Sequence, residues 1–171
     1  MYERSGDPDA IPLLLNHGWP GSFLEFLPLV QGLTDTATTQ AGKPVSFDVV
    51  IPSLPGFAFS SAPGPDWTVV DTARVFNTLM TEALGYPTYA IYGTDWGCGV
   101  GRELYDGYNS SVRAAHFSML GFLPLTPDQL AAQGIALDTP LLQFEEERWL
   151  NWSATGTGYF AEQGTKVRIR V

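Results

Sequence analysis

Short apolar segments alternate with longer amphipathic ones along the first two thirds of the chain, and this alternation constrains the fold most strongly. We expect strands at residues 10–16, 45–51, 88–92 and 112–120. We expect helices at residues 21–33, 68–84 and 98–108, where apolar residues recur at helical spacing. Strands separated by helices predict an α/β fold with a mostly parallel sheet and right-handed crossover helices.

The composition changes after Gly121, which predicts two parts of unequal size. Residues 1–123 hold all the expected strands, whereas residues 124–171 hold an acidic and aromatic helical segment, QFEEERWLNW. We therefore expect a core domain at 1–123 and a separate segment at 124–171 that lies over the sheet. With 44% hydrophobic residues in 171, the chain can build a sizeable core.

Charge and cysteine content exclude several classes of protein. A formal net charge of −9 with nine Lys and Arg residues argues against nucleic-acid binding, which needs a basic surface. A single cysteine, Cys98, excludes an internal disulfide and a cysteine-based zinc site. Because no apolar run reaches membrane-spanning length and the start does not resemble a signal peptide, we expect a soluble, cytoplasmic protein. We also expect no metal and no cofactor.

The segment GTDWGCG, residues 93–99, lies where an expected strand turns into an expected helix. Small residues at Gly93, Gly97 and Cys98 allow a sharp bend that exposes one side chain at the carboxyl edge of the sheet. That side chain is Asp95. An aspartate there can attack carbon as a covalent nucleophile, and it can equally cap the helix N-terminus. This segment taken alone favours neither role.

The segment HGWPG, residues 17–21, follows the first expected strand and should open at the same edge of the sheet. We expect a cis peptide at Trp19–Pro20. Such a loop can direct the backbone N–H of Trp19 toward the same point as that of Trp96, and two converging N–H groups form an oxyanion hole. We expect His17 to fix this loop by hydrogen bonding, and His116 to be a core residue of its strand.

Four segments together resemble the epoxide hydrolases of the α/β-hydrolase fold, in particular the microsomal-type group. They are HGWPGSFLEFLPLV, PSLPGFAFSSAP, LMTEALGYPTYAIYGTDWG and TGYFAEQGTK, and they occur in the order found in that family. The resemblance implies a partial α/β-hydrolase fold with an incomplete helical lid at residues 124–171. It also implies hydrolysis of a small apolar epoxide to a vicinal diol.

The resemblance assigns roles to individual residues. Asp95 corresponds to the nucleophile that forms a covalent ester, and Trp19 and Trp96 correspond to the oxyanion-hole donors. Tyr159 corresponds to the lid tyrosine that donates a proton to the epoxide oxygen. From the residues themselves, we expect Phe57 and either Trp149 or Trp152 to line an apolar substrate pocket.

One part of the family pattern is missing. Such enzymes use a late histidine to activate water and an acid to orient it, but the two histidines here, His17 and His116, match other positions. We therefore interpret the chain as truncated within the lid and expect any ester at Asp95 to persist. Open sheet edges predict marginal stability and allow oligomerisation.

Two other functions remain open. The first is a haloalkane dehalogenase-like or other aspartate-nucleophile hydrolase, which would not need Tyr159. The second is an inactive fragment that binds a small apolar ligand or a partner chain, in which case replacing Asp95 would change nothing measurable.

Overall fold

The computed structural model describes residues 1–119, 127–134 and 140–158. The chain forms two compact units, Met1–Phe122 and Leu123–Val171.

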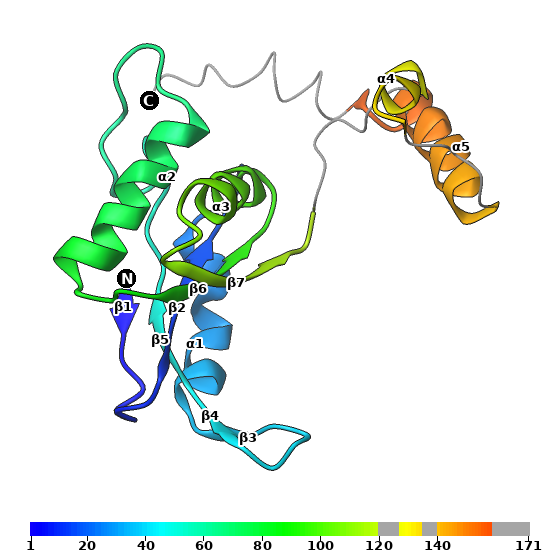
Figure 1. Ribbon diagram of the computed structural model, residues 1–171. Helices are drawn as coiled ribbons and strands as arrows, with labels where there is room; N and C mark the ends of the chain where they lie inside the picture. The colour runs from blue at the N-terminus through cyan, green and yellow to red at the C-terminus, as the bar shows by residue number, and fades with distance from the viewer. Residues whose placement is uncertain (120–126, 135–139, 159–171) are drawn as a thin grey trace. The chain divides into compact units, whose positions relative to one another are not determined.

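The first unit is built on a five-stranded sheet (Figure 1). Its strand order is β1-β5-β2-β6-β7, and only β1 is antiparallel to its neighbour. The strands are β1 Tyr2–Glu3, β5 Phe47–Val50, β2 Ile11–Asn16, β6 Tyr89–Gly93 and β7 Val112–Phe117. The predicted mostly parallel α/β sheet is therefore confirmed.

Helices cover the two faces of this sheet, because alternate residues of each strand point to opposite sides. Figure 1 shows α2 and α3 on one side of the sheet and α1 on the other. These helices are α1 Leu27–Thr34, α2 Val69–Thr78 and α3 Trp96–Gly107. In β2, Leu14 is buried in the core shared with α2 and α3, whereas Leu13 and Leu15 are buried in the core shared with α1. The apolar residues of β2 thus contribute to the hydrophobic cores on both faces of the sheet.

The helix expected at residues 21–33 is in fact two elements. Ser22 caps a short 3-10 helix, η1 Phe23–Phe26, by accepting a hydrogen bond from the Leu24 N–H at 3.3 Å. The α-helix begins only at Leu27, which places Pro28 in its first turn. Proline lacks an N–H group and is tolerated there, so it sets where α1 begins and does not kink a longer helix.

Three other local features differ from the sequence prediction. Between the expected helix at 21–33 and strand β5, the chain forms a two-stranded antiparallel pair, β3 Ala37–Thr38 with β4 Pro44–Val45. The helix that starts as α2 ends in a π-helical turn, η2 Leu79–Ala83. Helix α3 begins at Trp96, two residues before the predicted start, because the bend at Asp95 is sharp.

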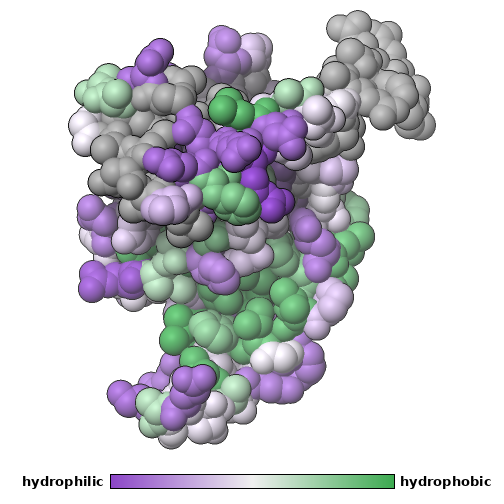
Figure 2. Space-filling model, turned by 90° about the vertical axis from the view of Figure 1, so that its right-hand side faces the viewer, coloured by the Kyte–Doolittle hydropathy of each residue, from purple (hydrophilic) through white to green (hydrophobic). Residues whose placement is uncertain are grey.

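The prediction that His116 is a core residue is wrong. Its side chain is exposed and its ring packs edge-on against the Tyr92 ring, with centroids 5.3 Å apart. β7 is an edge strand, and beside it an apolar groove of about 330 Å³ lies between α1 and the sheet. Figure 2 views this side and shows hydrophobic side chains gathered there. The groove is lined by Leu13, Leu15, Leu29, Leu33, Phe47, Ala90, Ile91, Tyr92, Ala114, Ala115 and His116.

A buried carboxylate ties the beginning of the chain to the sheet. Asp48 of β5 is 4% exposed and accepts hydrogen bonds from the Ser5 N–H at 2.9 Å and the Tyr86 hydroxyl at 2.6 Å. The Tyr86 hydroxyl oxygen also lies 2.6 Å from the hydroxyl oxygen of Tyr2, a residue of β1 that pairs with Val50 of β5. Burial, reinforced by the bond to Asp48, raises the pKa of Tyr86 above its usual value, so the hydroxyl stays protonated at neutral pH.

Replacing Tyr86 with phenylalanine is expected to lower the free energy of unfolding by about 1–2 kcal/mol, because Asp48 then loses a charge-assisted bond. Because the folded-state pKa of Tyr86 is raised, its contribution is complete below the unfolded pKa of about 10 and declines as the pH rises further. Urea unfolding at pH 7 and above pH 10 measures both effects. Tyr105→Phe, at a tyrosine that is 49% exposed, is the control expected to change little. Equal stability of the two variants would contradict this prediction.

The second unit contains α4 Pro127–Ala132 and α5 Pro140–Thr155. On α5 the rings of Trp149 and Trp152 lie 5.0 Å apart, and the Arg148 guanidinium lies 5.5 Å from the Phe144 ring centroid. None of the helices in the described ranges has the length and hydropathy of a membrane span.

Candidate functional site

The turn between β6 and α3 holds Asp95 in an unusual backbone conformation. Its φ is +49° and its ψ is −126°, which non-glycine residues rarely adopt and which surrounding contacts must maintain. The Thr94 N–H donates to the Asn16 carbonyl at 3.1 Å, and the Cys98 N–H donates to the Asp95 carbonyl at 2.9 Å. Asp95 occupies the N-cap position of α3, but its side chain makes no capping hydrogen bond. The carboxylate is therefore not used as a helix cap.

The glycines around the turn are required by close backbone contacts. A Cβ on Gly97 would lie 2.1 Å from the Asn16 carbonyl oxygen and 2.6 Å from that of His17. A Cβ on Gly93 would lie 2.5 Å from the Gly97 carbonyl oxygen. The small residues that the sequence places here are thus what lets α3 begin directly against the end of β2.

Replacing Gly97 with alanine is expected to lower the free energy of unfolding by more than about 2 kcal/mol, because the contacts are with backbone that cannot swing away. Gly99→Ala, on the same helix, is the matched control. Its Cβ would meet only Val69 at 3.8 Å, an ordinary contact, so it should be neutral or stabilising. Denaturant unfolding of both variants checks this, and a Gly97→Ala variant as stable as Gly99→Ala would contradict it.

The loop after β2 meets this turn. The backbone N–H of Trp19 donates to Oδ1 of Asp95 at 2.7 Å, and the Trp19–Pro20 peptide is cis, as expected. A Cβ on Gly18 would lie 2.3 Å from both Cβ and Oδ1 of Asp95. Two segments far apart in sequence are thus brought into contact around one half-buried carboxylate.

His17 fixes this loop, as the sequence predicts. Its side chain is fully buried, and Nε2 accepts a hydrogen bond from the Leu54 N–H at 3.0 Å. Nδ1 must then carry the proton that it donates to the Gly18 carbonyl at 3.1 Å. The ring also packs edge-on against Phe57, with centroids 5.4 Å apart. Since both ring nitrogens are engaged, His17 is a neutral structural residue.

The carbonyl of Gly93, at the end of β6, is a second anchor that the sequence did not reveal. It accepts hydrogen bonds from the Ser118 N–H at 3.1 Å and from the Cys98 Sγ at 3.0 Å. The Ser118 hydroxyl lies 3.3 Å from the same oxygen. Burial raises the pKa of the Cys98 thiol, and the charge of Asp95 adds to this, so Cys98 is a neutral donor.

The remaining predicted site residues are placed as follows. Trp96 is the first residue of α3, directly after Asp95, and its side chain is about half exposed at 49%. Phe57 is half-buried against His17 in the first unit, whereas Trp149 and Trp152 lie on α5 of the second unit. Tyr159 lies outside the described residues. The structure thus brings Asp95, Trp19 and Trp96 together.

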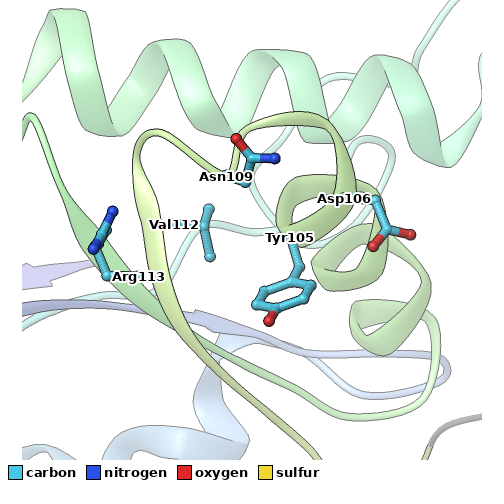
Figure 3. Close-up of a pocket in the computed structure, with 5 residues that line it drawn as sticks. All are labelled: Tyr105, Asp106, Asn109, Val112 and Arg113. Carbon is cyan, nitrogen blue, oxygen red and sulfur yellow. The ribbon is translucent and has the colours of Figure 1, made fainter.

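A surface pocket of about 350 Å³ lies at the opposite end of α3 from Asp95 (Figure 3). It is lined by Tyr105, Asp106, Asn109, Val112 and Arg113. Asp106 forms an exposed ion pair with Arg102 at 3.5 Å. The pocket holds no nucleophile with a base and is not part of the site. Among the described residues, no cluster of three or more His, Cys, Asp or Glu side chains could hold a metal ion.

Comparison with known proteins identifies the family of this chain. The model of the alpha/beta hydrolase fold family matches residues 11–168, so the chain belongs to that family. The putative epoxide hydrolase of Stigmatella aurantiaca is 37% identical over 172 residues, covering 97% of this chain and 36% of that protein. Epoxide hydrolase 1 of Oryctolagus cuniculus is 39% identical over 109 residues, covering 63% of this chain and 24% of that protein.

Solved structures agree with these relatives. The structure of Aspergillus niger epoxide hydrolase is 30% identical and superposes with a TM-score of 0.67, covering 96% of this chain and 41% of that one. The resemblance to epoxide hydrolases and the partial α/β-hydrolase fold are therefore confirmed. The chain spans between about a quarter and about a third of the length of these curated relatives.

Proposed function

We propose that this chain opens an epoxide ring by forming a covalent ester on Asp95. One observation carries the proposal: the Asp95 carboxylate sits on a strained strand-to-helix turn with Oδ1 held by the Trp19 N–H at 2.7 Å. Backbone strain that surrounding contacts maintain is typical of functional residues. The relatives that are named epoxide hydrolases support an epoxide as the substrate class, and we propose a small apolar one.

Ring opening follows from this arrangement. Because Oδ1 is held by Trp19, Oδ2 is the oxygen that attacks an epoxide carbon. As the new C–O bond forms, the ring C–O bond breaks and its electron pair moves to the epoxide oxygen. By the resemblance, Tyr159 donates the proton that this oxygen takes up. A phenol with a pKa near 10 can protonate a developing alkoxide, which is a much stronger base.

Ester hydrolysis requires a further group. When water adds to the acyl carbon, negative charge develops on Oδ1, and the N–H groups of Trp19 and Trp96 would stabilise it. The water must also lose a proton to a base. His17 has both ring nitrogens engaged, and His116 is exposed on β7. We therefore propose that the ester forms but turns over slowly.

We assign the second unit to the lid by the same resemblance. Residues 124–171 would then supply Tyr159 and one of Trp149 and Trp152, and Phe57 would line the pocket from the core domain.

The test is incubation of the full chain with styrene oxide, followed by intact-protein mass spectrometry. We expect a gain of one epoxide mass that persists after the reagent is removed, with peptide mapping placing it on Asp95. Tyr159→Phe should abolish the adduct with the epoxide but not one with an alkyl halide, which needs no proton. No adduct, or an adduct only on another residue, would overturn the proposal.

A further inference from the structure

Asn16, the last residue of β2, carries a buried amide that the site described above does not use. The side chain is fully buried, and neither Nδ2 nor Oδ1 has a hydrogen-bond partner among the described residues. Leu13, Leu14 and Leu15 precede it in the same strand and are all buried and apolar. An apolar side chain would suit such a position, so the amide there requires an explanation.

Asn16 also lies where the two halves of the site join. It pairs with Gly93 across the sheet, and its carbonyl accepts the Thr94 N–H at 3.1 Å, one residue before Asp95. Gly97 packs so closely on the same carbonyl that a Cβ would come within 2.1 Å of it. On its other side, Asn16 leads directly into the loop that begins at His17. Any movement of Asn16 therefore displaces both segments that hold the carboxylate.

The pleat of β2 determines where the amide lies. Asn16 shares a face with Leu14, which is buried in the core formed with α2 and α3. The amide is thus on the side of the sheet from which α3 starts. An amide can donate two hydrogen bonds and accept two, and an internal water molecule can satisfy both kinds of group at once.

We propose that the Asn16 amide binds one internal water molecule beside the nucleophile turn and that Asn16 is thereby a positioning residue for Asp95. The strained φ of Asp95 persists only if its surroundings fix it, and the Thr94–Asn16 hydrogen bond is one of the bonds that do so. An anchored Asn16 side chain keeps that carbonyl oriented. The positioning role, unlike the water site, rests on the proposed function.

Two variants of equal shape test the role. Asn16→Thr keeps a hydroxyl that can bind the water, whereas Asn16→Val differs only in lacking it. We expect Asn16→Thr to form the styrene oxide ester within about threefold of the wild-type rate, and Asn16→Val to be at least about tenfold slower. We also expect Asn16→Val to be at least as stable toward urea as Asn16→Thr, because burying a methyl group at this position costs less than burying a hydroxyl. A merely structural role would make the less stable variant the slower one.

A crystal structure of the wild-type chain supplies the independent measurement. Electron density for a water within hydrogen-bond distance of the Asn16 amide supports the proposal, and an amide without one overturns it. Equal ester-formation rates for Asn16→Val and Asn16→Thr would overturn the positioning role. If the wild-type chain forms no ester, the proposed function fails, and the density alone decides the water site.

Discussion

Replacing Asp95 with asparagine is expected to lower the rate of ester formation with an epoxide at least about a thousandfold. The amide has nearly the same shape, and its oxygen can still accept the hydrogen bond from the Trp19 N–H. It lacks the anionic oxygen that attacks carbon in the proposed function. Asparagine tolerates positive φ better than most residues, so the strained turn should survive the change. Intact-mass measurements over time give the rate.

Asp66→Asn is the matched control for this experiment. Asp66 is the other aspartate with a positive φ among the described residues, at +61°, and it is exposed. The same substitution there changes the same charge in a similar backbone conformation but away from Trp19. We expect its ester-formation rate to equal that of the wild type. An Asp95→Asn variant that labels as fast as Asp66→Asn would mean that the nucleophile is another residue.

The sequence predicts those elements of the fold that depend on local pattern. The continuous apolar run of β2 and the helical spacing of α2 are properties of neighbouring residues, and both elements form where they are expected. The strand β1 is different, because two residues carry no periodicity and Tyr2–Glu3 is a strand only through its pairing with Val49 and Val50. Its Tyr2 side chain also lies within hydrogen-bond distance of Tyr86, which lies far along the chain.

The distinction between features set by neighbouring residues and features set by distant ones also applies to the site. The need for a small residue at Gly93 is local, because a Cβ there would meet the Gly97 carbonyl of the same turn. The need at Gly97 comes from the Asn16 and His17 carbonyls, which lie far away in the sequence. The hydrogen bond from the Leu54 N–H to Nε2 of His17 joins two loops. These loops meet only once the sheet is assembled, so the sequence does not identify Leu54 as the partner of His17. The exposure of His116 depends on what covers β7, which no local pattern specifies. Sequence reasoning thus predicts the sharp turn at Asp95 but not the contacts that fix its carboxylate.

Gly18→Ala is expected to slow ester formation at least about a hundredfold without removing any reacting group, because a misplacement of about 1 Å can cost that much in rate. The added Cβ would lie 2.3 Å from Oδ1 of Asp95, so the carboxylate or the loop must move. Either movement lengthens the hydrogen bond from the Trp19 N–H, which in the proposed function fixes which carboxylate oxygen faces the substrate. Mass spectrometry gives the rate, and urea unfolding confirms that the variant is folded.

Gly32→Ala separates this effect from that of adding a methyl group to the chain. Gly32 lies in α1, and a Cβ there would meet nothing within 4 Å. We expect its labelling rate to be unchanged and its stability to rise by about 0.5–1 kcal/mol, because alanine favours the helix. If Gly18→Ala were folded and labelled at the Gly32→Ala rate, the Trp19 contact would not orient the nucleophile. Asp95→Asn and Gly18→Ala thus distinguish the two requirements of the site, since one removes the reacting oxygen and the other leaves it present but misplaced.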